Sequence, residues 1–412
     1  MKALSTAFPL AAILALTIGC GGSDSDRPKF GVVALAEGGI SIVDPVTQSV
    51  GAPALVGELG TAGGGRFDVA IAPGGDTTLV SNFGDSLVYF INTTDTTNPV
   101  VTNSVDIGFF AEDIAITRDG KFALVTDGGF SPTVAVVDMA TQTLLNTYTS
   151  EAIVVDDTTD PVTTYTPNFN AISISPDGKT VLAADYFYGA VVALTLDATG
   201  TLTYGSYVSL LPDATKPGQL FRPVNITIAP NGKTAVAAVT GYTNEEDPEN
   251  TFEVLGFPTV KITSPGVISL GNYNVTTRSL KASQTAVFSP SGSKVYVYCT
   301  PVVPTPAPTT EPGNVIVELD IAAGGVLTDA GKVTELGFIG RSQLFGVDTM
   351  ALDRSGRYLY VSNMTLSGAK SELEVLDLHR PEFIKTLPFA DIDIDEDGTG
   401  EATLPTGICF AP

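Results

Sequence analysis

The most specific chemical pattern in the sequence is an acidic loop near its end, DIDIDEDGTGEATL at residues 391–404. Its candidate metal ligands alternate along the loop: Asp393, Asp395, Asp397, the Thr399 carbonyl and Glu401. Alternate oxygens at this spacing can converge on one hard cation at about 2.4 Å, as in a calcium-binding loop. Leu404 stands where such loops end in a bidentate glutamate. A solvated acidic loop without an ion is therefore the alternative.

A second set of polar residues borders the short apolar stretches that predict β-strands. Eight precede such a stretch: Arg66, Asp68, Glu112, Asp113, Asn170, Arg222, Asn225 and Asp348. Four more follow one: Asn82, Asp127, Asp185 and Asn363. If the fold gathers them, these carboxylates, amides and two arginines could hold a cation or grip an anionic small molecule. The alternative is a set of polar caps that satisfy strand ends and buried water.

The elements that must position these residues recur along the chain. Six tight turns have related sequences: APGGD (72–76), TRDGK (117–121), SPDGK (175–179), APNGK (229–233), SPSGS (289–293) and DRSGR (353–357). Each turn joins two apolar stretches, and its glycine supplies the positive φ that a tight hairpin needs. A third stretch ends in Asp or Asn at seven places: Asp44, Asn92, Asp138, Asp197, Asn272, Asp320 and Asp377. We expect these side chains to cap the turn that follows.

A repeated four-stranded unit predicts a β-propeller, whose radial packing leaves only short strand edges. Seven third strands with six complete turns indicate seven blades, one of them divided between the two ends of the chain. Residues 29–50 supply the second, third and fourth strands of that blade, and PTGICFAP (405–412) supplies the first. The predicted fold is an all-β, seven-bladed propeller of four-stranded antiparallel blades over residues 29–412. Pairing of the C-terminal strand with the N-terminal strands would close the ring.

The repeat resembles the YVTN-type repeat of seven-bladed propellers, a group that includes the lactonase-like family. The resemblance rests on LVSN (79–82), LVTD (124–127) and YVSN (360–363), on third strands such as VAVVD, and on the PDGK turn. It implies ester hydrolysis at the mouth of the ring, with Glu112 or Asp113 as the base and Arg66 or Arg222 stabilising the oxyanion.

The sequence departs from the lactonase-like pattern in its histidines. Such propellers carry a His-x-His-like element before some first strands, whereas this chain has one histidine, His379. That residue follows a third strand, so we expect it on the face opposite the polar residues. A Ser-His-Asp triad fails for the same reason, because its single candidate base would be away from the long loops. We also expect no haem, because there is no C-x-x-C-H motif and no second histidine to ligate a metal. We expect no nucleotide either.

Loop lengths predict which face carries the function. The first-to-second turns are tight, whereas the expected second-to-third loops extend over residues 241–265 and 300–313. One connection between blades extends over residues 151–169. In a propeller these two kinds of loop share one face, which we call the top face, and function concentrates in such variable loops. The polar residues described above would surround the top mouth of the ring.

The charge of the chain limits its partners. A formal net charge of −24 repels nucleic acid and anionic membrane surfaces and favours cations or a cationic partner. Cys299 and Cys409 each lie in an apolar strand pattern, which favours two small buried side chains over a disulfide or a reactive thiol.

The first 28 residues predict a targeting signal. Residues 1–19 combine Lys2 with an apolar run at 7–18, and LTIGC ends at Cys20, which resembles a lipoprotein signal with Cys20 as the lipidated residue. An ordinary signal peptide is the alternative. Residues 20–28 would be a polar tether reaching at most about 30 Å, and Gly21 resembles the residue found after outer-membrane lipidation sites. Membrane contact would then be through the lipid alone.

The sequence as a whole predicts an exported, envelope-anchored propeller that binds a ligand or protein partner with its top-face loops. Calcium at residues 393–401 would stabilise the connection before the closing strand. The competing prediction is a lactonase-like hydrolase acting at the top mouth, which requires an acid, a base and an oxyanion donor that converge.

Overall fold

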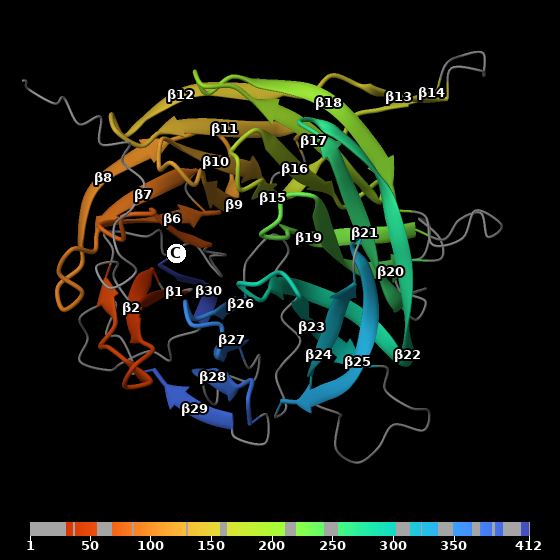
Figure 1. The fold of residues 1–412 in the computed structure, drawn as a ribbon. Coiled ribbons are helices and arrows are strands. Elements are labelled where there is room, and N and C mark those ends of the chain that lie inside the picture. Colours follow the sequence, from red (N-terminus) through yellow and green to blue (C-terminus); the bar gives the residue numbers. More distant parts are fainter. Residues whose placement is uncertain are drawn as a thin grey trace, which may run out of the picture.

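The computed structural model describes residues 30–35, 38–55, 68–84, 86–128, 131–156, 163–210, 220–242, 254–301, 314–322, 324–336, 349–364, 371–380, 384–389 and 405–411. The regular elements in these ranges are β-strands, and they form blades arranged around a common axis (Figure 1). The predicted all-β, seven-bladed propeller is confirmed. Within the same ranges, we find no helix with the length and apolar character needed to cross a membrane.

Four blades are separate four-stranded antiparallel sheets. Blade 2 contains β5 (Val69–Ile71), β6 (Thr77–Asn82), β7 (Leu87–Asn92) and β8 (Val100–Asp106). Blade 3 contains β9 (Ala111–Ile116), β10 (Phe122–Asp127), β11 (Thr133–Asp138) and β12 (Thr143–Thr149). Blade 4 contains β15 (Phe169–Ile174), β16 (Thr180–Asp185), β17 (Ala190–Leu196) and β18 (Leu202–Ser209). Blade 7 contains β26 (Met350–Leu352), β27 (Tyr358–Met364), β28 (Ser371–Asp377) and β29 (Ile384–Pro388).

Blades 5 and 6 are joined by one long strand. Their seven-stranded sheet has the order β19 (Leu220–Ile228), β20 (Thr234–Tyr242), β21 (Val254–Ser264), β22 (Val267–Phe288), β23 (Lys294–Pro301), β24 (Val315–Ala322) and β25 (Val326–Glu335). The 22-residue β22 is the fourth strand of blade 5 and continues as the first strand of blade 6.

This arrangement corrects two predictions. The stretch GVISLGN, expected as a third strand ending at Asn272, belongs to the fourth strand β22, and β21 is the third strand. The loop expected over 241–265 is therefore shorter, because its second half is β21.

Blade 1 closes the ring as predicted. Its order is β30 (Pro405–Phe410), β1 (Gly31–Leu35), β2 (Gly39–Asp44) and β3 (Ser49–Val50), with β4 (Ala54–Leu55) also paired to β2. β30 is antiparallel to β1, with Gly31 opposite Phe410 and Val33 opposite Ile408. Every first strand in the ring, including β30, thus has a second strand beside it.

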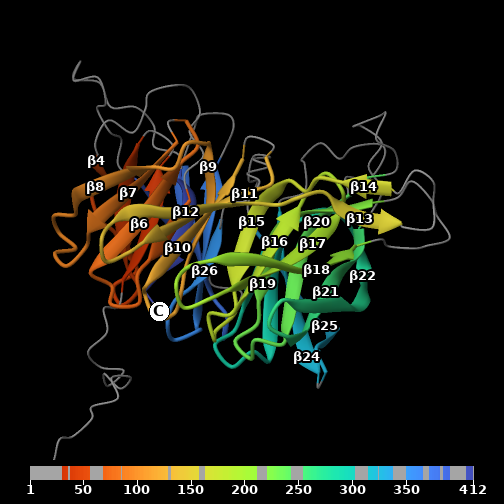
Figure 2. The same ribbon diagram turned by 90° about the horizontal axis from the view of Figure 1, so that it is seen from above.

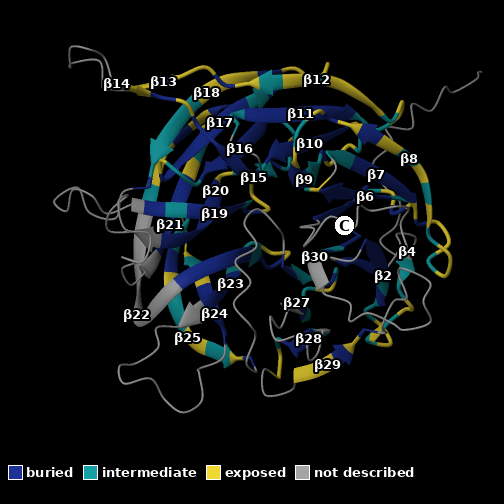
Figure 3. Cartoon of the chain, turned by 180° about the vertical axis from the view of Figure 1, so that it is seen from behind, coloured by how far each residue is buried: buried dark blue, intermediate teal, exposed yellow. Residues whose placement is uncertain are grey.

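The core lies between blades, so the inner strands are buried on both faces. Every residue of β10 and of β16 is buried, whereas the fourth strands β12 and β29 are largely exposed (Figure 3). Apolar side chains on one face of a blade pack against the facing side of the next. Phe169 and Val181 of blade 4, for example, share a cluster with Leu124 and Val136 of blade 3.

The six predicted turns lie on one face, which we call the bottom face, together with the third-to-fourth turns. Their glycines have the expected positive φ, between 67° and 74°. The second residue of the turn is a proline in four blades, and each of these prolines packs beside the turn glycine of the next blade. The pairs are Pro73 with Gly120, Pro176 with Gly232, Pro230 with Gly292, and Pro290 with Gly356. The turns therefore stabilise contacts between blades as well as within them.

Capping of the third-strand ends is confirmed at five of the seven predicted positions. Side-chain oxygens accept hydrogen bonds from the backbone of the following turn at Asp44, Asn92, Asp138, Asp197 and Asp377. The hydrogen bond from the Thr141 backbone holds the pKa of Asp138 below its ordinary value. Asp320 instead accepts a hydrogen bond from Lys294 Nζ at 2.8 Å, and Asn272 lies within β22.

One connection between blades contains structure that the sequence did not predict. Between blades 3 and 4, β13 (Ile153–Asp156) pairs with β14 (Thr163–Tyr165) as an antiparallel hairpin. Figure 2 shows this hairpin at the outer edge of the ring. It brings Tyr165 against blade 4, where Tyr165 joins the hydrophobic cluster that contains Phe169.

Candidate functional site

Three of the predicted top-face residues bind the backbone of the next blade. Each bond joins one first strand to the next: Asp68 Oδ2 accepts from Ile114 N at 3.2 Å, Asp113 Oδ2 accepts from Ile172 N at 2.6 Å, and Asn170 Nδ2 donates to the carbonyls of Pro223 and Val224, both at 3.2 Å. All three side chains are buried. These residues therefore add polar connections between inner strands of neighbouring blades, as does the hydrogen bond from Ile228 N on β19 to Ser173 Oγ on β15.

The residues predicted for hydrolysis lie on different blades. Glu112 is on β9, in blade 3, and is only 3% exposed. Its Oε2 lies close to Gly128, where a Cβ atom would approach it to 2.6 Å. Arg222 is on β19, in blade 5, and its guanidinium carbon lies 5.4 Å from the centre of the Tyr186 ring. The first strand of blade 4, β15, lies between the two residues in the order of the ring.

Residues at the ends of second strands bond to their own loops. Asn82 Oδ1 accepts a hydrogen bond from Gly84 N at 2.9 Å, and Asp185 Oδ1 accepts one from Tyr188 N at 3.2 Å. Asp127 is buried at the equivalent end of β10. Asn225 is buried on β19, and its Oδ1 accepts a hydrogen bond from Thr227.

Several predicted residues lie outside the described part of the chain. They are Cys20, Arg66, Asp348 and the five candidate calcium ligands Asp393, Asp395, Asp397, Thr399 and Glu401. Within the described part, no group of three or more His, Cys, Asp or Glu side chains could hold a metal ion. His379 is in the turn after β28, on the bottom face, and its backbone N donates to Asp377. Its position on the face opposite the polar residues agrees with the prediction.

The most unusual polar environment surrounds Asp185. This side chain is fully buried, and its Oδ2 has no hydrogen-bond partner in the described structure. Two neighbouring buried atoms, the Tyr165 hydroxyl and Asn168 Nδ2, also have none. Buried polar atoms in proteins are almost always satisfied by protein or by ordered water. We therefore expect ordered water to satisfy these three atoms.

Burial raises the pKa of Asp185 to about 7, although hydrogen bonds from the backbone of Tyr188, Asn168 and Phe187 act in the opposite direction. Burial also raises the pKa of the Tyr165 hydroxyl well above its ordinary value, and the nearby Asp185 carboxyl adds to this effect. A carboxyl with a raised pKa therefore lies beside a buried phenol whose pKa is also raised.

A group of tyrosines covers the outer side of the same region. We call it the tyrosine cluster, and it consists of Tyr148, Tyr165, Tyr188, Tyr204 and Tyr207. The ring centres of Tyr165 and Tyr188 are 4.2 Å apart, and those of Tyr165 and Tyr207 are 6.1 Å apart with the rings nearly perpendicular. Tyr188 and Tyr204 are each 45% exposed. The cluster thus combines a packed base with two rings that face solvent.

The sequence analysis did not identify the tyrosine cluster, because its members come from separate elements: β12, β14, the loop after β16, and β18. Only one local signal was available. The stretch YFY at residues 186–188 directly follows Asp185, whereas the equivalent Asn82 is followed by a single aromatic residue, Phe83.

Neither a protein-family model nor a curated protein sequence matches the chain. Solved structures do. A functionally unknown protein from Desulfotomaculum acetoxidans is 21% identical, with a TM-score of 0.66 over 93% of this chain and 99% of that one. The periplasmic gluconolactonase of Pseudomonas aeruginosa is 16% identical, with a TM-score of 0.60 over 93% of this chain and 99% of that one.

The fold is also shared with a dehydrogenase, whose name indicates an activity other than that of a lactonase. The dihydro-heme d1 dehydrogenase NirN is 13% identical, with a TM-score of 0.54 over 93% of this chain and 77% of that one. At these identities the likeness concerns the fold alone, and one fold can carry many activities. The chain is therefore a seven-bladed β-propeller related in structure to the lactonase-like propellers.

Proposed function

We propose that the protein is a binding or scaffold propeller of the cell envelope, and that it recognises its partner with the tyrosine cluster. The observation that carries this proposal is the exposure of Tyr188, whose ring packs on Tyr165, and of Tyr204, which lies near Tyr207. Tyrosine is enriched in protein interfaces, because its ring buries a large area and its hydroxyl keeps a hydrogen bond. A ring held by its neighbours also loses little entropy on binding.

The charge of the chain indicates the chemistry of the partner. With a net charge of −24, the propeller attracts cationic surfaces and repels anionic ones. We therefore propose a partner that presents basic or neutral groups around an apolar centre. Arginine suits such a surface, because its guanidinium stacks on tyrosine rings and is attracted to their faces.

A comparison of variants tests this function. Envelope proteins that bind the immobilised chain would be quantified for the wild type and for a variant in which Tyr188 and Tyr204 are both serine. Val100→Ser is the matched control, because Val100 is 51% exposed on β8 of blade 2. Binding that is weakened at least tenfold in the double variant and unchanged in the control supports the proposal. Equal binding by all three proteins would overturn it.

A lactonase-like hydrolase is the second candidate, and the likeness of the fold to the periplasmic gluconolactonase favours it. Against it, the Asp113 carboxylate already accepts a hydrogen bond from Ile172 N. A screen of lactones and esters would separate the two functions. Turnover that disappears in both Arg66→Ala and Glu112→Ala would make the hydrolase the better interpretation.

The location and the ion are parts of the same proposal. We propose a lipid anchor at Cys20 that holds the propeller at the outer membrane, with Cys20→Ser moving the protein from the membrane fraction to the soluble fraction.

We also propose Ca²⁺ at residues 393–401, just before β30. Titration calorimetry would detect this ion as heat, together with a rise in melting temperature, and the absence of both would exclude it.

A further inference from the structure

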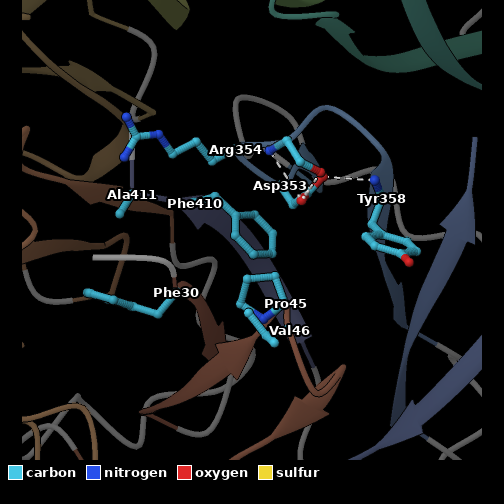
Figure 4. A pocket seen from close by; sticks show the side chains of 9 residues that line it. Phe30, Pro45, Val46, Asp353, Arg354, Tyr358, Phe410 and Ala411 are labelled. Atoms are coloured by element: carbon cyan, nitrogen blue, oxygen red, sulfur yellow. Dashed lines mark hydrogen bonds between the residues drawn. The ribbon is translucent and has the colours of Figure 1, made fainter. Parts of the chain in front are cut away.

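A cavity lies on the bottom face of the ring, opposite the tyrosine cluster. Its volume is about 440 Å³, within the range of small-molecule sites. Residues from four parts of the chain line it: Phe30, Pro45, Val46, Asp353, Arg354, Ser355, Tyr358, Phe410 and Ala411 (Figure 4). The cavity therefore lies where blade 7 meets the closing blade 1.

The cavity exists because two features of the repeat change at this place. In blade 1, β30 and β1 come from opposite ends of the sequence, so no hairpin turn joins them. Their ends meet through a hydrogen bond from Ala411 N to Phe30 O at 3.0 Å. In blade 7, Arg354 takes the turn position at which four other blades have a proline packed beside the next blade. In those four blades a hairpin turn and a turn proline fill the corresponding space between neighbouring turns. Between blades 7 and 1 both are missing, and the space is open.

The walls of the cavity are mainly aromatic and aliphatic. Phe30 and Phe410 are buried, and Pro45 lies beside the Phe410 ring in Figure 4, with Tyr358 on the other side. Val46 lies at the rim and is 77% exposed. These groups provide flat apolar surfaces against which an aromatic ring can stack.

The polar side of the cavity carries one cation and one carboxylate, and the carboxylate is used within its own turn. Asp353 accepts four hydrogen bonds, from Arg357 N, Tyr358 N, Ser355 N and Ser355 Oγ. Arg354 follows it in the sequence and extends along the cavity towards Ala411 (Figure 4). A guanidinium offers paired N–H donors that match a carboxylate or a sulfonate.

From this combination we infer that the cavity binds a planar aromatic anion, with its ring against Phe410, Pro45 and Tyr358 and its acidic group on Arg354. An apolar wall alone would accept many hydrophobic molecules. The arginine selects those that carry a negative charge, which the rest of this strongly acidic protein repels. The site is independent of the proposed function, since it lies on the other face.

The first test uses a fluorescent aromatic anion, 1-anilinonaphthalene-8-sulfonate, with the folded full chain. We expect saturable 1:1 binding that 2-naphthoate displaces and the neutral 2-naphthamide does not. Arg354→Gln should weaken binding about tenfold, as expected for loss of a charge-assisted hydrogen bond. Arg118→Gln is the matched control, because Arg118 holds the same turn position in blade 3 and does not line the cavity.

A second test places a reporter at the rim. The chain contains no tryptophan, so Val46→Trp introduces a single one at an exposed position that leaves the core intact. Bound probe should quench this tryptophan by energy transfer, and 2-naphthoate should restore its emission. The inference is overturned if the probe does not saturate, if Arg354→Gln and Arg118→Gln behave alike, or if naphthamide competes as well as naphthoate.

Discussion

Replacing Asp185 by asparagine should stabilise the protein at neutral pH and have little effect in acid. The carboxyl is fully buried at the end of β16, and its Oδ2 has no hydrogen-bond partner in the described structure. Asparagine has nearly the same shape, and its Oδ1 can still accept the hydrogen bond from Tyr188 N. The substitution therefore removes a buried ionisable group and keeps its main contact.

The size of the effect follows from the pKa of Asp185, which is about 7 in the folded protein against an ordinary value of 3.8. Below pH 3.8 both states hold the proton, and the carboxyl does not affect folding. Between pH 3.8 and 7 the unfolded state releases the proton first, so the free energy of unfolding falls as pH rises. Above pH 7 the carboxyl is ionised in both states, and it then lowers the free energy of unfolding by about 4 kcal/mol in total.

Urea unfolding of both proteins between pH 4 and pH 8.5 measures this difference directly. The stability gained by Asp185→Asn should grow from less than about 1 kcal/mol at pH 4 to about 4 kcal/mol at pH 8. Asp377→Asn is the control of opposite sign, because Arg357 holds the pKa of Asp377 far below its ordinary value. That variant should lose stability by a nearly constant amount between pH 4 and pH 8.5, because the pKa of Asp377 lies below this range in both the folded and the unfolded state. A gain from Asp185→Asn that is the same at every pH would refute the reasoning.

Three further predictions concern contacts between blades. Arg118→Pro should raise the free energy of unfolding by about 0.4–1 kcal/mol, since it restores the turn proline of the other blades. A Cβ atom added to the facing Gly178 would meet no atom within 4 Å, so the proline ring has room beside this glycine. A lower free energy of unfolding in urea would show that the proline does not fit. Asp113→Ala should lower the free energy of unfolding by about 1–3 kcal/mol, because the buried Ile172 N–H loses its acceptor. A decrease of less than about 0.5 kcal/mol would mean that water replaces the carboxylate. Deleting residues 404–412 should lower the melting temperature of the whole ring, and calorimetry that instead shows an unchanged cooperative transition would contradict the role of β30 in closure.

The sequence was sufficient to predict the architecture, because the repeat encodes each blade locally. Turn glycines such as Gly178 and capping residues such as Asp138 depend on neighbours only a few positions away, and both behave as predicted. The ring closure was also predictable, since a first strand without a turn at one end matched a second strand without a partner at the other. The error at GVISLGN arose where β22 continues from blade 5 into blade 6 without a break. A strand that changes blade has the same period-2 pattern as two separate strands.

The candidate site was less predictable, because it depends on contacts between distant elements. The polar residues Asp68, Asp113 and Asn170 lie on or next to inner strands, but their partners belong to other blades. Asp113, for example, bonds to Ile172, which is 59 residues away. The tyrosine cluster draws on elements that only the folded ring brings together, and the raised pKa of Asp185 results from that burial. No local sequence pattern carries this information.

Three sets of contacts between blades explain why so many polar residues recur at equivalent positions. First strands are joined by Asp113 and its equivalents, and bottom turns are joined by proline and glycine. Fourth strands reach the next blade through Asn103, Asn146 and Ser206, which bond to the carbonyls of Gln142, Gly200 and Gly266. A residue that repeats around the ring is therefore explained by assembly of the blades.

Residues that break the repeat need a different explanation, and they indicate where this propeller is specialised. Tyr165 comes from a hairpin that only the connection between blades 3 and 4 contains among the described connections. Arg354 replaces a proline beside the one blade that has no first-to-second turn. These two departures lie on opposite faces, one beside the tyrosine cluster and the other in the bottom cavity. If both proposals hold, exchanging either residue should alter one binding activity and leave the other unchanged, because no element of the repeat links the two sites.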